Sequence, residues 1–378
     1  MARELTELLT GRDQYELQYQ SPSDLIDLLA ARHLDIDLER AEAEYWIETL
    51  GYFHLKGYLS VLKEPVAREN YRPGTKFSDA IELLLWEQRL RAVLLEQIGK
   101  VEVRLRSALV ECIGHGHGDG YLLDENYDVS RLKNQKAVKQ DRRSQVELSD
   151  WDWFVDWLGK RINAALHDQD YEFVRGHVNK RKNQHLPLWM LLEIMSLGDL
   201  LNFYERLSPK NRAFVASKLA NPDAAGGQLK DNELARILEA IRTLRNMASH
   251  YHAFFNKRFP FPSMTDYRAK FRDSPYFPSV AAKRKACSTY EVILMLLYLE
   301  PAVQRDDAFS TEVAGILSDF PVSIQGVSDK TYGGHKGWSL DAPWRRDVAQ
   351  SAGDEESTKS RRKQKNSKAN YAKGKRRR

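Results

Sequence analysis

Apolar residues recur three and four positions apart along most of the chain, and few segments show the strict alternation that is typical of a strand. The longest periodic segment starts near Ser78 and ends at about Ile113, where a glycine-rich break begins. The helix that it predicts can bury one stripe of side chains, formed by Leu83, Trp86, Leu90, Val93, Leu94, Val101, Leu105 and Cys112. Gln88, Arg91 and Lys100 fall outside that stripe. The pattern predicts an all-α fold around one long scaffold helix.

Shorter helices are expected before and after this scaffold helix. Ser21 and Ser23 can cap a helix through Leu25, Leu28 and Leu29, and a second helix follows from about Asp37 to Leu50, before Gly51. Further patterns predict helices at WDWFVDW (residues 151–157), from Pro187 through Phe203, from Asn232 to His252, from Ser288 to Ala302 and from Thr311 to Phe320. After Pro187, the side chains available for burial are Trp189, Leu192, Met195, Leu200 and Phe203. The basic stretch from Arg131 to Arg143 predicts a loop.

Composition divides the chain into three regions. We expect residues 1–70 to form a helical region packed on a main helical domain of residues 71–320, and residues 321–378 to form a linker and a tail. Residues 357–378 contain eleven Lys or Arg and no acidic residue, whereas the rest of the chain has fewer basic than acidic residues. Such a block of like charge repels itself and stays disordered. It either keeps the protein soluble or contacts nucleic acid.

The composition also indicates the compartment. Apolar residues make up 42% of the chain, as in a globular protein, and the two cysteines, Cys112 and Cys287, cannot form a disulfide framework. The longest purely apolar run, Val292 to Leu299, is too short to span a bilayer, and the start of the chain does not resemble a signal peptide. We therefore expect a cytoplasmic protein without membrane contact.

Several kinds of site find little support in the sequence. The stretch GHGHGDG, residues 114–120, has histidines and an aspartate that suit a metal ion, but a flexible turn explains its glycines more simply. No serine lies in a nucleophile elbow, and neither cysteine has a histidine placed beside it by the sequence. No phosphate-binding loop or dinucleotide fingerprint is present. Nucleotide hydrolysis and hydride transfer are therefore not indicated.

The stretch LRNMASHYHAFF, residues 244–255, places an arginine and a histidine near the end of a predicted helix. An arginine that keeps its charge and a histidine that titrates near neutrality suit phosphodiester cleavage without a metal. Five helical positions leave Arg245 and His250 roughly 140° apart, whereas Asn246 and His250 share a face, so Asn246 could orient the imidazole. An arginine followed by a histidine after four to six intervening residues is expected roughly three times by chance, and the chain has three such pairs. The plain alternative is a helix-end histidine beside a surface arginine.

Four blocks, taken in order, resemble one family. They are LGYFHLKGYLSVL (50–62), FSDAIELLLWEQRLRAVLLEQIGKVEVRLRSAL (77–109), LPLWMLLEIMSLGDLLNFYERL (186–207) and LRNMASHYHAFFN (244–256). The set resembles the Abi-like family of bacterial abortive-infection proteins, the AbiD and AbiF type, within the HEPN superfamily of helical ribonucleases and RNA-binding domains. Arg245, Asn246 and His250 match the family's Arg, Asn and first His. Tyr251 stands where a second histidine is usual, and Ala253 where an arginine is common.

The resemblance implies a HEPN-like helical bundle with an N-terminal helical extension and a metal-independent endoribonuclease that uses no cofactor. A ribose 2′-hydroxyl would attack the adjacent phosphate, with His250 as acid or base, Arg245 on the phosphate charge and Asn246 as the orienting group. A site that needs two copies of these groups implies a homodimer. The cations expected to contact RNA are Lys257, Arg258, Arg106, Arg361, Arg362 and Lys363. The setting would be phage defence or toxin action.

Two other functions remain open at this stage. The same basic groups could hold RNA without cutting it, as in a binding or scaffold protein, or the chain could be a toxin silenced by an RNA or protein antitoxin. Arg106 has two interpretations as well. It stands four residues after Glu102, so a local ion pair is favoured over a contact to phosphate.

Overall fold

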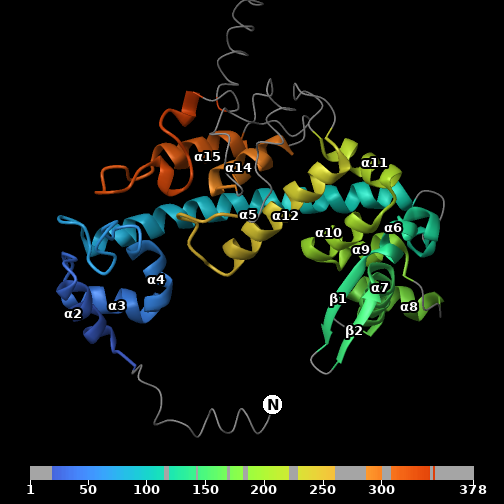
Figure 1. Ribbon diagram of the computed structural model, residues 1–378, viewed down its shortest axis with the longest axis horizontal. Helices are drawn as coiled ribbons and strands as arrows, with labels where there is room; N and C mark the ends of the chain where they lie inside the picture. The colour runs from blue at the N-terminus through green and yellow to red at the C-terminus, as the bar shows by residue number, and fades with distance from the viewer. Residues whose placement is uncertain are drawn as a thin grey trace, which may run out of the picture.

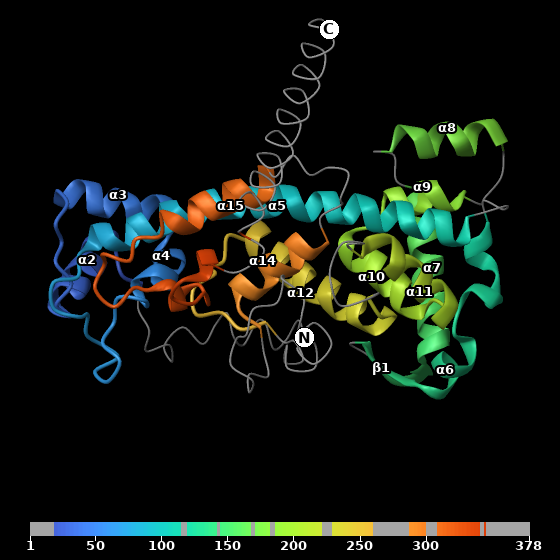
Figure 2. The same cartoon turned by 90° about the horizontal axis from the view of Figure 1, so that it is seen from above.

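The computed structural model describes residues 19–114, 119–141, 144–167, 171–181, 186–220, 229–259, 287–299, 308–340 and 344. The described chain is mostly helical, with one two-stranded hairpin, which confirms the all-α prediction. Helix α5 (Phe77–Ile113) extends along the long axis of the molecule (Figures 1 and 2), and the other elements pack along it. No helix of the described residues is long and apolar enough to cross a membrane.

Helix α5 has the boundaries that the apolar pattern predicts. Its first turn is fixed by the Asp79 carboxylate, which accepts a hydrogen bond from the Lys76 amide at 2.8 Å, and its last turn ends at Gly114. The predicted stripe is buried except for half-buried Cys112. One position differs: Arg91, expected outside the stripe, is almost completely buried.

Three short helices lie near the start of α5 (Figure 1): α2 (Pro22–Ala31), α3 (Arg40–Leu50) and α4 (Tyr52–Leu59), of which α4 packs on α5, α3 on α4 and α2 on α3. The Ser21 hydroxyl accepts from the Asp24 amide and the Asp24 carboxylate accepts from the Ser21 amide, which forms the capping box expected of a helix start. Gly51, with a φ of 78°, separates α3 from α4 in a conformation that favours glycine. Both predicted helices are therefore confirmed.

The other end of α5 carries two 3₁₀ turns, a helix, a hairpin and two more helices. These are η2 (Gly120–Leu122), η3 (Asp124–Asn126), α6 (Val129–Asn134), β1 (Lys136–Asp141), β2 (Ser144–Ser149), α7 (Asp150–His167) and α8 (Glu172–Arg181). The antiparallel hairpin pairs Lys136 with Ser149 and Asp141 with Ser144. The loop prediction is therefore wrong for residues 131–141, which contain the end of α6 and strand β1, the partner of the alternating sequence SQVELS in β2; residues 142 and 143 lie outside the described residues.

The segment after Pro187 forms two helices instead of the one predicted, α9 (Leu188–Glu193) and α10 (Leu197–Arg206), followed by α11 (Pro209–Leu219). Ser196 starts the second helix, because its side chain and the Asp199 carboxylate form a capping box. Trp189, expected to be buried, is 49% exposed, whereas the other four residues named for burial are buried. The break turns α10 so that its apolar face packs on α12 and α5.

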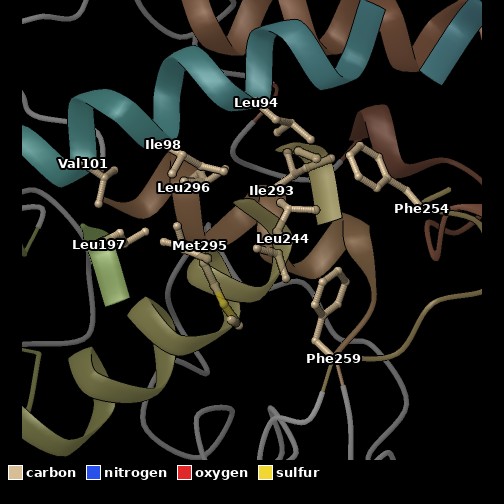
Figure 3. Packing of buried hydrophobic residues seen from close by; sticks show 14 of the residues in the cluster. Leu94, Ile98, Val101, Leu197, Leu244, Phe254, Phe259, Ile293, Met295 and Leu296 are labelled. Atoms are coloured by element: carbon tan, nitrogen blue, oxygen red, sulfur yellow. The ribbon is translucent and has the colours of Figure 1, made fainter. Parts of the chain in front are cut away.

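The centre of the core joins α5 to three later helices, α12 (Asp231–Ser249), α14 (Thr289–Tyr298) and α15 (Ala308–Ser318). Figure 3 shows Leu94 and Ile98 of α5 close to Leu244 of α12 and to Ile293 and Leu296 of α14. All five side chains are buried. The core thus fixes the last turns of α12 against the middle of α5.

Residues 321–340 differ from the linker that their composition predicts. They contain the short turns η5 (Asp329–Thr331) and η6 (Trp338–Leu340), and Ile324, Val327, Tyr332 and Trp338 are buried. The Tyr332 ring lies 5.7 Å from the ring of Trp86 on α5. Most residues of this segment are polar or glycine, but several of its apolar residues are buried. The segment is therefore part of the folded domain.

Candidate active site at the end of helix α12

Helix α12 ends where the sequence places the arginine and histidine motif. His250 is the C-cap residue, and Tyr251 follows with a φ of 55°, a left-handed conformation in which a non-glycine residue is uncommon. The His252 amide donates to the Met247 carbonyl at 2.9 Å and the Tyr251 amide to the Ala248 carbonyl at 3.2 Å. These two bonds form a Schellman motif, which ends the helix and begins loop 250–259.

The three predicted catalytic residues lie at this helix end, but one expected contact is not formed. Arg245 and Asn246 are half-buried, and His250 is exposed. Arg245 Nη1 donates to Asn246 Oδ1 at 3.2 Å, whereas no hydrogen bond among the described residues joins Asn246 to the His250 ring. Asn246 therefore contacts the guanidinium and not the imidazole. The ring centroids of His250 and His252 are 6.0 Å apart, so a second imidazole lies beside the first.

A buried ion pair on α5 holds this loop in place. The Glu87 carboxylate accepts hydrogen bonds from the Arg91 guanidinium at 2.5 Å, the Tyr58 hydroxyl at 2.9 Å and the Phe254 amide at 2.6 Å. Burial raises the pKa of Glu87 to about 7, against the opposing effects of the Phe254 amide, Arg91 and Tyr58. The carboxylate thus satisfies a backbone donor of loop 250–259 from within the core.

Arg91 contacts the same loop from a second direction. Its Nη2 donates to the His252 carbonyl at 3.0 Å, and its guanidinium carbon lies 4.7 Å from the centre of the Tyr251 ring and 5.0 Å from that of Phe254. Cation–π contacts of a desolvated arginine are worth about 2 kcal/mol. Residues 251 to 254 are therefore anchored through a carbonyl, an amide and two rings, while His250 and His252 stay exposed.

Helix α4 completes the surroundings of the loop. A Cβ atom on Gly57 would lie only 2.7 Å from the Cβ of Ala253, so a glycine is required for this close approach. The His54 ring lies 6.5 Å from the Tyr251 ring. Burial first, and then the charges of Arg91 and His252, lower the pKa of His54.

Sequence reasoning did not single out His54, Glu87 or Arg91. The only signal for His54 was its position inside LGYFHLKGYLSVL, and for Glu87 and Arg91 a spacing of four residues on the scaffold helix. Neither signal predicts contact with a loop more than 150 positions later in the chain.

The cations predicted to contact RNA are in different situations. Lys257 and Arg258 are exposed on loop 250–259, next to Asn256. Arg106 lies inward: it donates to the Leu192 carbonyl at 2.8 Å and the Met195 carbonyl at 3.3 Å, and it pairs with Glu102. These contacts include the local ion pair, and the RNA contact of Arg106 stays a prediction. Arg361, Arg362 and Lys363 lie outside the described residues.

A second Arg/His spacing provides an internal comparison. Arg161 and His167 lie on α7, but Arg161 is paired with Asp199 at 2.9 Å, and His167 Nδ1 lies 2.8 Å from the Asn163 carbonyl. Arg245 forms no ion pair within the described ranges. Of these two motifs, the one at the end of α12 leaves its guanidinium charge available to a ligand.

No group of three His, Cys, Asp or Glu side chains in the described part of the chain is arranged to hold a metal ion. His115 and His117 of GHGHGDG lie outside the described residues. The groups at the end of α12 are thus nitrogen donors and cations, which suit proton transfer and the binding of an anion.

The profile of a family described as Abi-like protein matches residues 45–256, more than half of the chain. The chain belongs to the Abi-like protein family. Comparisons with curated proteins and with solved structures gave no match. Membership in the Abi-like family suggests a role in abortive infection, a bacterial defence against phage. The matched residues of this Abi-like protein include Gly57, the Glu87–Arg91 pair and the arginine and histidine of α12, whereas residues 321–340 lie beyond them.

Proposed function

We propose that this Abi-like protein is a metal-independent endoribonuclease of the HEPN type that acts in phage defence. One observation carries the proposal. An exposed His250 and an Arg245 with no ion pair to the described residues lie at the end of α12, beside a loop that a buried ion pair anchors to α5. Catalysis needs groups held in a fixed geometry, and a loop tied down from the core supplies that.

The proposed reaction is an internal transfer at one RNA linkage. An imidazole takes the proton of a ribose 2′-hydroxyl, and the 2′-oxygen bonds to the adjacent phosphorus. The bond from phosphorus to the 5′-oxygen breaks, and a protonated imidazole gives a proton to that oxygen. The products are a 2′,3′-cyclic phosphate and a 5′-hydroxyl. We assign His250 as acid or base, Arg245 to the phosphate charge, and Asn246 to the orientation of Arg245.

Cleavage of a labelled RNA in EDTA tests the chemistry. We expect wild-type protein to produce 2′,3′-cyclic ends. The His250→Ala and Arg245→Ala variants should each lose at least about 100-fold in rate, the first through loss of a proton-transfer group and the second through loss of the charge that stabilises the phosphate. His167→Ala, which alters the helix-end histidine of α7, is the matched control and retains wild-type activity. Full activity in both α12 variants would remove the assignment.

We also propose that two copies form the site, because the family resemblance implies a site with a second arginine and a second histidine, which a two-fold partner would supply. Mixing the inactive His250→Ala and Arg245→Ala proteins tests this. If each copy contributes a different residue to one linkage, the mixture recovers part of the activity. No recovery, together with a monomer in sedimentation, would place all the groups in one copy.

Two outcomes would redirect the assignment. Salt-sensitive RNA binding without strand scission would indicate a binding or scaffold protein. If expression of the protein is toxic and a neighbouring locus suppresses that toxicity, the locus encodes an antitoxin. The His250→Ala variant distinguishes this toxicity from the effect of overexpression alone.

A further inference from the structure

A pocket of about 540 Å³ lies where the turn after α4 meets loop 250–259 and the packed segment 321–340. Asn256 of the loop is part of its wall, together with residues from 60–72 and from 326–331. Asn256 is six residues after His250, and six residues span at most about 20 Å. The pocket is thus within reach of a few nucleotides from the proposed site of cleavage.

The charge of this pocket is strongly positive. Its lining includes four cations, Lys63, Arg68, Arg72 and Lys330, and one carboxylate, Glu64. None of the four cations forms an ion pair with a carboxylate of the described residues, whereas Arg40, Arg89, Arg91, Arg106, Arg131, Arg161, Arg206, Arg212 and Arg242 all do. Four cations around one pocket favour the binding of an anion in it.

Neighbouring cations strengthen this field. Burial first, and then the charges of Arg32 and Lys56, lower the pKa of Lys63, with Glu69 acting in the opposite direction. The Lys63 ammonium also lies 5.7 Å from the centre of the Tyr71 ring, which limits where it can move. Like charges held this close repel one another, and a bound anion relieves that repulsion.

Hydrogen bonds and close packing fix the wall of the pocket formed by Arg72 and segment 326–331. Arg72 Nη1 donates to the Val61 carbonyl at 2.8 Å, and its guanidinium passes so close to Gly326 that a Cβ there would lie 2.1 Å from Nη1. Gly326 has a φ of 81°, which also favours glycine. The Asn256 amide donates to the Thr331 carbonyl at 2.8 Å, so segment 326–331 is tied directly to loop 250–259.

A second pocket shows that such charge is not general on this end of the molecule. It encloses about 840 Å³, its lining includes Glu42, Glu82 and Asp319, and its cation, Arg89, is paired with Asp319 at 3.0 Å. An RNA strand is repelled by this second pocket and attracted by the first.

We propose that the basic pocket, defined by Lys63, Arg68, Arg72, Lys330 and Asn256, binds backbone phosphates of the RNA strand beside the linkage that is cut. This inference rests on the proposed function. Residues 326–331, which complete the pocket, lie beyond the residues that match the family, so one wall of this subsite comes from the C-terminal part of the chain. It holds the strand and takes no part in bond breaking.

The test measures binding of a fluorescent single-stranded RNA to the full chain in the His250→Ala background, over a range of salt concentrations. Arg68→Gln and Lys330→Gln remove two exposed cations whose side chains make no hydrogen bond to the described residues, so both variants should fold. We expect the double variant to bind about ten-fold more weakly. Its salt slope should fall by about 0.7 for each phosphate that the variant no longer neutralises.

Arg89→Gln, which removes a cation from the second pocket, is the matched control and should leave affinity and slope unchanged. Equal effects of the control and the double variant, or an unchanged salt slope in the double variant, would overturn the subsite. Loss of binding to phosphatidylglycerol vesicles with unchanged RNA binding would assign the pocket to a membrane surface instead. Cleavage assays, made with His250 intact, keep the two proposals separate. RNA that the wild type binds through the pocket but never cuts removes the nuclease alone. Normal cleavage with an unchanged KM by Arg68→Gln/Lys330→Gln, made in the wild-type background, removes the subsite alone.

Discussion

Helix α5 carries two glutamate–arginine pairs with the same spacing and order, Glu87 with Arg91 and Glu102 with Arg106. The first pair joins Arg91 Nη2 to Glu87 Oε1 at 2.5 Å, with side chains 3% and 0% exposed. The second joins Arg106 Nη2 to Glu102 Oε1 at 3.2 Å, with side chains 13% and 20% exposed. The difference lies in their surroundings. Glu87 and Arg91 face loop 250–259, whereas Arg106 faces the break between α9 and α10.

Both pairs have a similar structural role, but the first pair is more deeply buried than the second. Each satisfies backbone groups at a place where a helix ends, because chain ends leave carbonyls and amides without helical partners. At the end of α12, the pair lies in the core and positions the residues next to His250. At the end of α9, the pair is partly exposed and stabilises a turn far from that site.

The largest expected effect is the loss of stability on removing Glu87. Glu87→Ala leaves Arg91 buried without its counterion and the Phe254 amide without an acceptor, which should lower the free energy of unfolding by about 3–5 kcal/mol. Glu102→Ala should lower it by about 1 kcal/mol or less. Urea denaturation of the two variants measures the difference directly. Equal losses would show that depth does not separate the two pairs.

The pH dependence of stability distinguishes the pairs next. Burial raises the pKa of Glu87 to about 7 from its ordinary value of 4.5, so the folded state favours the protonated carboxyl. The resulting stability is fully present below pH 4.5 and is lost as the pH rises through 7, a change of roughly 3 kcal/mol. Denaturation curves from about pH 4 to about pH 8 should show this decline in the wild type and in Glu102→Gln. Glu87→Gln should remove it, and a decline that persists in Glu87→Gln would assign it to another group.

The features that sequence predicted are those set by neighbours in the chain. Apolar spacing placed α5, the Ser21 cap placed α2, and the pattern of α12 put His250 at a helix end. Local rules failed where a partner was distant. Arg91 falls outside the apolar stripe, and its burial depends on Tyr251, His252 and Phe254, which no local pattern connects to α5.

The Arg/His spacing illustrates the same limit within the site. Arg161 with His167 and Arg245 with His250 have similar spacings, with five and four intervening residues, yet Arg161 is neutralised by Asp199, from a different helix. The apolar pattern does not predict the break at residues 194–196 between α9 and α10, for a related reason. Ser196 and Asp199 form a capping box inside a run of apolar residues that by itself continues as one helix.

Arg106 gives the third prediction, with a smaller effect. Arg106→Ala should lower the free energy of unfolding by about 1–3 kcal/mol, because the Leu192 and Met195 carbonyls lose their donor. Arg106→Lys should recover only part of this, since an ammonium lacks the forked geometry that reaches both carbonyls. RNA affinity should stay unchanged in both variants. A weaker affinity with normal stability would instead support the RNA contact that the sequence predicts.

The smallest effects come from two helical glycines, one beside each pair. On α4, Gly57→Ala forces Ala253 away from its position, because the new Cβ would lie 2.7 Å from that of Ala253. Overpacking of this kind costs about 1–3 kcal/mol, from which the better helix propensity of alanine subtracts up to about 1 kcal/mol. On α5, Gly99 has nothing within 4 Å of such a Cβ, so Gly99→Ala gains the propensity alone and should stabilise the protein by about 0.5–1 kcal/mol.

Thermal unfolding measures both glycine variants, and cleavage assays show which of them reaches the site. Because Ala253 lies between His252 and Phe254, a shift of this residue alters the two contacts through which Glu87 and Arg91 hold the loop. Gly57→Ala should therefore reduce RNA cleavage by more than its loss of stability explains at a temperature where the variant remains folded. Gly99→Ala should leave the rate unchanged. If the two variants cut RNA equally well, the position of loop 250–259 does not control the rate, and the buried pair serves stability alone.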